Sequence, residues 1–167
     1  LVTSIADRLA GEGFQMVFLG TGESRYEDFL RGLEERRREC VRSMIMFDRK
    51  LSKRIYAAAD IFLMPSKSEP CGLAQMICSR YGAIPVVRET GGLADSIKGY
   101  WEDEAGIHGN GFTFANFSHE ELYERTRAAA ELWKDKKKRA LFVAKIMKTD
   151  FSWDASAGKY LELYQSL

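Results

Sequence analysis

The chain has 167 residues, of which 46% are apolar and 29% are charged, and its formal charge is +1 at pH 7. This length suits one domain with a substantial core, and the balanced charge argues against nucleic acid or a membrane surface as a partner. Three cysteines and two histidines, none at metal-ligand spacing, favour a reducing, cytoplasmic setting over a disulfide scaffold or a metal site.

Helical and strand patterns alternate along the chain. Helices are expected at Val2–Gly11, Tyr26–Arg38, Leu51–Ala58, Cys71–Tyr81, Leu93–Lys98, His119–Leu132, Lys136–Thr149 and Trp153–Tyr164. Strands are expected at Gln15–Leu19, Ser43–Phe47, Asp60–Met64, Ile84–Arg88 and Phe112–Phe114, with a polar loop at Gly99–Gly111. Short apolar strands separated by helices predict an α/β fold, a Rossmann-like parallel sheet flanked by helices on both faces.

The loops that follow the strands are the expected ligand site, because open parallel sheets bind ligands beyond the carboxyl ends of their strands. Four such loops occur, at Gly20–Glu23, Phe47–Arg49, Ser66–Gly72 and Glu89–Gly92. Three of them contain turn glycines or the start of a helix that could receive an anion. We expect them to converge on one crevice.

The segment Ser66–Gln75 carries the strongest chemical signal. It joins an apolar strand to a helix, so free backbone N–H groups and the positive end of a helix dipole should meet at one place that suits a diphosphate. Glu69 adds a carboxylate at the same turn, where it could hold sugar hydroxyls. This combination indicates an enzyme that acts on a sugar phosphate.

Simpler explanations exist for most of these residues. The Gly20–Gly22 and Thr90–Gly92 segments could be ordinary turns, and Phe47, taken alone, fits a core position better than a base-stacking one. Cys71 is better interpreted as a small buried packing residue than as a reactive thiol. Glu69 could be a charge that simply suits the helix dipole.

The first residues already follow a helical pattern, with Leu1, Ile5 and Leu9 on one face and no capping residue before them. We therefore expect a piece of a larger protein, with a trimmed or processed chain as the alternative.

Three segments resemble bacterial glycogen synthases and plant starch synthases: Tyr56–Ser66, Glu69–Gln75 and Arg80–Asp95. The tail at Asp150–Trp153 is similar to the end of the same proteins. The similarity extends along essentially the whole chain and is most specific from Asp60 to Asp95.

The resemblance implies the C-terminal half of a GT-B glycosyltransferase, a pair of Rossmann-like domains with the active site between them. Residues 1–167 would form a single nucleotide-sugar-binding C-terminal domain, whose first strand and N-terminal partner domain lie outside the sequence. The implied reaction transfers glucose from ADP-glucose to the non-reducing end of an α-1,4-glucan with retention. It would occur in the cytoplasm, or in the plastid of a plant, with ADP-glucose as substrate and no cofactor or metal.

The resemblance also assigns roles at the central turn. Glu69 would be the catalytic carboxylate beside the donor glucose, where it holds sugar hydroxyls and supports oxocarbenium-like charge. The backbone N–H groups around Cys71, Gly72 and Leu73 would cradle the distal phosphate as negative charge grows on the leaving diphosphate.

Further positions match the family's nucleotide pocket. Phe47 would lie against adenine, and Thr90, Gly91 and Gly92 would line the same pocket. The chain departs from the family at Ala74, where a threonine is common, so one hydroxyl near the phosphates is lost.

Other parts of the family's machinery are not found in the sequence. They are the Arg and Lys that clamp the diphosphate from the first strand, and the Lys-x-Gly-Gly-Leu motif of the N-terminal domain. We therefore expect the chain alone not to catalyse transfer, to bind ADP weakly and to be marginally stable.

Two alternatives remain. The chain could belong to another GT-B glycosyltransferase that uses a UDP- or GDP-sugar, although Cys71–Leu73 together with Thr90–Leu93 argues against this. It could also be a stand-alone nucleotide-binding module. A partly exposed apolar face at the N-terminal edge and around Trp153 and Tyr164 would favour a larger protein instead.

Overall fold

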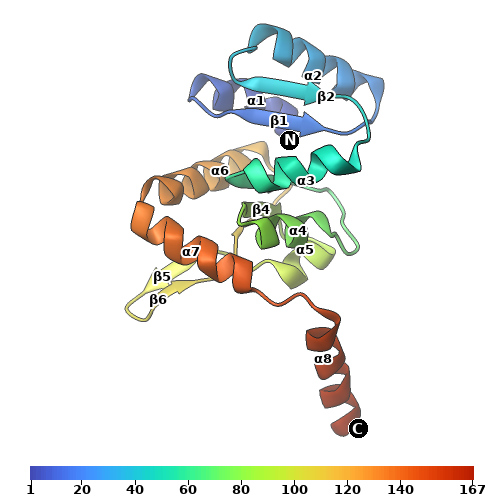
Figure 1. Ribbon diagram of the computed structural model, residues 1–167, viewed down its shortest axis with the longest axis vertical. Coiled ribbons are helices and arrows are strands. Elements are labelled where there is room, and N and C mark those ends of the chain that lie inside the picture. Colours follow the sequence, from blue (N-terminus) through green and yellow to red (C-terminus); the bar gives the residue numbers. More distant parts are fainter.

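The computed structural model describes residues 1–167, which form eight helices and seven strands (Figure 1). The helices are α1 (Val2–Gly11), α2 (Ser24–Arg36), α3 (Arg49–Ala58), α4 (Ala74–Tyr81), α5 (Gly91–Ser96), α6 (His119–Lys134), α7 (Lys136–Lys148) and α8 (Trp153–Gln165). The strands are β1 (Met16–Leu19), β2 (Val41–Met44), β3 (Ile61–Met64), β4 (Ile84–Arg88), β5 (Trp101–Asp103), β6 (Gly106–His108) and β7 (Phe112–Phe114). The α/β fold with parallel strands and flanking helices is confirmed.

The larger half of the molecule is built on the parallel sheet β3–β4–β7. Strand β4 lies in its middle, and its first four residues are buried, as expected for a strand covered on both faces. A core of twelve buried residues joins this sheet to α1, α6 and α7. Phe142 of α7 is fully buried there and meets the rings of Tyr100 and Phe112 edge-on.

The smaller half is the parallel pair β1–β2, which packs against α1 and α2. Its core contains only four buried residues, among them Leu33 and Val41. In Figure 1, α3 and α6 lie between this pair of strands and the rest of the larger half. Strand β1 pairs only with β2, and β3 pairs only with β4, so the parallel strands form two separate sheets. The residue pattern of a strand shows that it is a strand, but it does not show whether the edge of β1 pairs with the edge of β3.

The stretch Gly99–Gly111 is not the loop that the sequence predicts. It contains the antiparallel hairpin β5–β6, in which Trp101 stacks on His108 with ring centroids 3.8 Å apart. Asp103 accepts hydrogen bonds from the backbone N–H groups of Ala105 and Gly106, which closes the turn. Two strands of three residues are too short to show a period in the sequence.

Most boundaries agree with the sequence to within a few residues. The positive φ of 89° at Gly82 ends α4 as expected, because glycine adopts the left-handed conformation without a Cβ clash. The expected strand Ser43–Phe47 is displaced, since β2 ends at Met44 and leaves Phe47 beyond it. The helix expected from Cys71 begins at Ala74, and the one expected from Leu93 begins two residues earlier.

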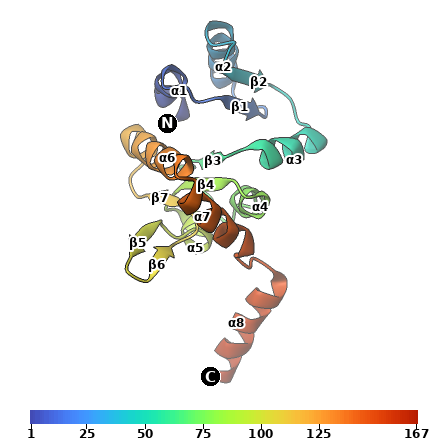
Figure 2. The same ribbon diagram turned by 60° about the vertical axis from the view of Figure 1, so that its left-hand side comes forward.

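Helix α8 projects away from the body of the molecule, as Figures 1 and 2 both show. None of its residues is buried, and it leaves Trp153, Tyr160, Leu161 and Tyr164 exposed. This is the exposed apolar surface around Trp153 and Tyr164 that was given above as a sign of a larger protein. None of the eight helices combines the length and apolar character needed to cross a bilayer.

Candidate functional site

The turn between β3 and α4 leaves backbone donors free. No hydrogen bond within the protein uses the N–H group of Gly72 or Leu73. Gly72 has a φ of 74°, which a residue with a side chain rarely adopts. The positive end of α4 lies directly after these two residues, so free donors and the helix dipole act at the same place.

Glu69 lies half-buried in this turn without a cationic partner. Its carboxylate is within 3.4 Å of one side-chain donor, the Oγ of Ser66, and forms no salt bridge. Its backbone carbonyl is held separately, because it accepts a hydrogen bond of 3.1 Å from the N–H of Gly92. The backbone is therefore fixed while carboxylate oxygens remain available to hydroxyl groups.

The second loop, Glu89–Gly92, packs against the Glu69 turn backbone to backbone. A Cβ placed on Gly91 would lie 2.1 Å from the carbonyl oxygen of Glu69, and one on Gly92 would lie 2.0 Å from that of Cys71. Neither contact is sterically possible for another residue type. The two glycines are thus required for this close approach, and Thr90, which precedes α5, is carried to the same place.

Arg88 fixes the other side of the turn. Its guanidinium donates from Nε to the carbonyl of Ser66 at 2.9 Å, from Nη2 to that of Lys67 at 2.5 Å, and from Nη1 to that of Ala115 at 3.2 Å. Arg88 is not among the site residues predicted from the sequence. The sequence signal that could have identified Arg88 is its position as a charged residue at the end of an otherwise buried strand.

The other two predicted loops do not join this arrangement. Phe47 is 89% exposed after β2, so it is not a core residue. The carboxylate of Asp48 caps α3 by accepting from the N–H groups of Lys50 and Leu51. The N–H of Gly22 donates to Glu27 within its own half of the molecule. No hydrogen bond or ion pair links either loop to the Glu69 turn.

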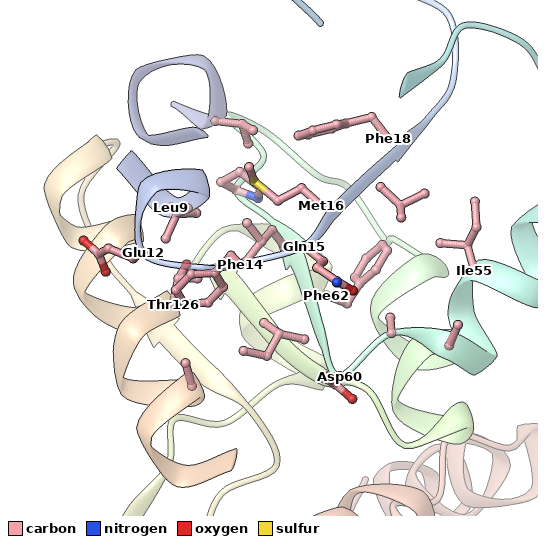
Figure 3. A pocket seen from close by; sticks show the side chains of 18 of the residues that line it. Leu9, Glu12, Phe14, Gln15, Met16, Phe18, Ile55, Asp60, Phe62 and Thr126 are labelled. Atoms are coloured by element: carbon pink, nitrogen blue, oxygen red, sulfur yellow. The ribbon is translucent and has the colours of Figure 1, made fainter. Parts of the chain in front are cut away.

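A large cavity of about 1730 Å³ separates the two parallel sheets, and we call it the inter-sheet cavity. Figure 3 shows that Met16, Phe18 and Phe62 contribute to its walls, and 18 of its 29 lining residues are hydrophobic. Asp60 lies at its border, where partial burial raises the pKa of the carboxyl group. None of the predicted site residues lines this cavity.

The cysteines divide by environment. Cys71 is exposed in the Glu69 turn, so its interpretation as a buried packing residue is wrong. Cys78 is buried in α4, and its burial raises the pKa of the thiol to about 12. All three cysteines are free thiols. No group of three or more His, Cys, Asp or Glu side chains comes together in a way that could hold a metal ion.

Comparison with known proteins shows which proteins the chain is similar to. No family model matches the chain. The glycogen synthase of Clostridium perfringens is 48% identical over 167 residues, which is all of this chain and 34% of that protein. The glycogen synthase of Clostridium beijerinckii is 47% identical over the same share. The chain is a glycogen synthase homologue. It spans about a third of the length of the curated relatives it matches.

Solved structures agree with this relationship. The catalytic domain of starch synthase IV from Arabidopsis thaliana, bound to ADP and acarbose, superimposes on 99% of this homologue with a TM-score of 0.83 and 37% identity, over 34% of its own chain. HepE from Anabaena, in complex with UDP-glucose, covers 98% with a TM-score of 0.66 at 20% identity, over 44% of its own chain. At this identity, the similarity to HepE concerns the fold alone. The chain described here has the fold of a GT-B glycosyltransferase domain.

Proposed function

We propose that this chain is the donor-binding C-terminal domain of a glycogen or starch synthase. The complete enzyme would transfer glucose from ADP-glucose to the non-reducing end of an α-1,4-glucan with retention. The observation that carries the proposal is the Glu69 turn, where a carboxylate without a cation partner lies beside two free backbone donors at the start of a helix. The structure of the starch synthase IV catalytic domain supports the proposal, because that protein is bound to ADP and acarbose.

The phosphate end of the donor belongs at the N-terminus of α4. The N–H groups of Gly72 and Leu73 would donate to the distal phosphate, beside Cys71 in the same turn. When the bond between glucose and this phosphate breaks, negative charge grows on the leaving diphosphate. Donors that are already in position stabilise that charge without a reorganisation cost.

Glu69 would act on the sugar. Its carboxylate would accept hydrogen bonds from glucose hydroxyls and stabilise positive charge as the anomeric carbon acquires oxocarbenium character. Thr90, Gly91 and Gly92 would line the pocket beside it. Phe47 would stack on adenine, a role for which its exposed ring is available.

The remaining parts of the reaction would come from outside this sequence. The acceptor glucan would bind mainly to an N-terminal domain, so we expect the 167-residue chain alone to be inactive. A further strand would lie between β1 and β3, whose facing edges border the inter-sheet cavity without pairing. The enzyme would work in the cytoplasm, or in the plastid of a plant, and needs no metal or cofactor in this scheme.

An amide NMR titration with ADP, with UDP as the control, tests the donor site. Shifts at Phe47, Cys71–Leu73 and Thr90–Gly92 with ADP alone are the expected result. Equal shifts with both nucleotides would favour a glycosyltransferase that uses another nucleotide-sugar. If ADP shifts resonances only elsewhere on the protein, the site is wrong.

Substitution of the carboxylate separates chemistry from nucleotide binding. In the protein at full natural length, Glu69→Gln should lower kcat by about a hundredfold or more, because the charge that stabilises the transition state is lost. Its affinity for ADP should be nearly unchanged, since ADP has no glucose for Glu69 to hold. Steady-state kinetics and calorimetric titration measure the two quantities, and a variant with full kcat would remove Glu69 from the mechanism.

A further inference from the structure

Gln75 is a buried polar side chain between the two loops of the candidate site. It lies in the first turn of α4 and is 0% exposed. Its Nε2 donates to the carbonyl of Gly72 at 2.8 Å, to that of Cys71 at 3.3 Å and to the Oγ of Ser96 at 3.0 Å. One amide group therefore contacts the Glu69 turn and the end of α5 at once.

Ser96 extends this contact to the second loop. Its hydroxyl donates to the carbonyl of Gly92 at 2.6 Å while its oxygen accepts from Gln75. A continuous hydrogen-bonded path thus runs from Gly72 through Gln75 and Ser96 to Gly92. These are the backbone segments that the proposed function assigns to the phosphate and to the wall of the pocket.

The carbonyls that Gln75 holds determine where the free donors point. The carbonyl of Cys71 shares a peptide plane with the N–H of Gly72, and the carbonyl of Gly72 shares one with the N–H of Leu73. Every peptide bond in the chain is trans, so N–H and C=O point in opposite directions within each plane. When both carbonyls are drawn toward Gln75, both N–H groups are directed away from it.

The other end of the amide has no partner. The Oε1 of Gln75 is buried and accepts no hydrogen bond, which is unfavourable for stability. Turning the amide over would not help, because Oε1 would then face the carbonyl oxygens of Cys71 and Gly72. A Cβ on Gly72 would also lie 2.6 Å from Oε1, so the glycine leaves room for this arrangement. The side chain fits a role in geometry better than a role in stability.

We propose that Gln75 is the positioning residue of the donor site. By holding the carbonyls of Cys71 and Gly72, it directs the N–H groups of Gly72 and Leu73 toward the distal phosphate. Through Ser96 it also keeps Thr90–Gly92 in register with the Glu69 turn. This inference rests on the proposed function for the identity of the ligand, but the orientation of the two N–H groups does not depend on it.

The test replaces Gln75 by methionine in the protein at full natural length. Gln75→Met keeps most of the side-chain volume and removes all three donated hydrogen bonds. The matched control is Ser79→Ala, because Ser79 is also 0% exposed in α4 and its hydroxyl donates to the carbonyl of Gln75 within the helix. We expect affinity for ADP to fall about tenfold in Gln75→Met and to be nearly unchanged in Ser79→Ala.

A second readout does not require a ligand. Without nucleotide, ¹⁵N relaxation should show new motion at residues 71–73 in Gln75→Met and none in Ser79→Ala. If the unsubstituted protein fails to bind ADP, the proposed function fails, and this comparison still decides the role of Gln75. Equal affinity and equal order in the two variants would overturn the proposal.

Ser96→Ala provides an independent variant in case Gln75→Met does not fold. It removes the link to Gly92 but leaves the two carbonyl contacts of Gln75 in place. New motion should then appear at residues 90–92 and not at 71–73. Motion in both segments, or in neither, would contradict the hydrogen-bonded path.

Discussion

The two halves of the molecule are built on separate sheets and have cores of different size, and the separation of the sheets decides which of the predicted loops meet. The β3–β4–β7 half has a core of twelve buried residues, whereas the β1–β2 half has four. Both loops that pack together, Ser66–Gly72 and Glu89–Gly92, follow strands of the larger half. Both loops that stay apart, Gly20–Glu23 and Phe47–Arg49, follow strands of the smaller half, across the inter-sheet cavity. Loops converge as a crevice only where the strands beneath them form one sheet.

The largest expected effect comes from removing a side chain in the larger core. Phe142→Ala should destabilise the protein by about 3–5 kcal/mol, because it leaves a cavity between α7 and the rings of Tyr100 and Phe112. Leu33→Ala is the matched change in the smaller core. Hydrogen exchange should accelerate throughout the larger half in the first variant and only around β1 and β2 in the second. Uniform acceleration in both would show that the two halves unfold as one unit.

Alkaline pH should act on the larger half through Cys78. Its thiol ionises less readily in the folded chain than its ordinary pKa of 9.0 implies, so its stabilising contribution is complete below that pH and is lost as the pH rises toward 12. The loss amounts to about 4 kcal/mol at most. Urea unfolding at pH 8 and pH 11 measures it, and Cys78→Ala should lose less stability over this interval than the unsubstituted protein. Equal losses in both proteins would mean that the thiol contributes nothing.

A smaller effect should follow from a methyl group between the two loops. Gly92→Ala places a Cβ against the carbonyl of Cys71, and forcing the loops apart should cost about 1–3 kcal/mol and weaken ADP binding. Gly22→Ala is the control, because a Cβ there meets nothing within 4 Å. Thermal unfolding and ADP titration measure both variants. A Gly92→Ala protein with unchanged melting temperature and affinity would contradict the close approach.

The smallest effect is expected from removing α8. A chain that stops after Ser152 loses no buried residue, so its melting temperature should stay within about 2 °C of the original. Differential scanning calorimetry on the shortened and the original chain measures the two melting temperatures. A fall of many degrees would show that α8 contributes to the folded body after all.

Much of the fold is predictable because its signals are local. Helix periodicity, the stop at Gly82 and the buried strand Ile84–Arg88 can be read from neighbouring residues. The meeting of the Glu69 turn with Gly91 and Gly92 is also predictable, since both follow adjacent strands of one parallel sheet.

The remainder depends on contacts between distant segments. Arg88 binds carbonyls 22 and 27 residues away in the sequence, and Gln75 reaches Ser96, so no local pattern reveals their partners. The division of the sheet is hidden for the same reason, because a strand's composition does not state which neighbour lies along its edge. The role of each predicted site residue stays a prediction, which the ADP titration and the kinetics of Glu69→Gln test.

The exposure of α8 has a consequence for the energetics of any surface that covers it. A helix of 13 residues is marginal in water without tertiary contacts. Docking of Trp153 and Tyr164 would therefore stabilise the helix against fraying in the same step, and the entropy lost by about a dozen residues would be subtracted from the contact energy. Such an association would be weak for its area but sharply dependent on temperature, and circular dichroism would register it as a gain of helix.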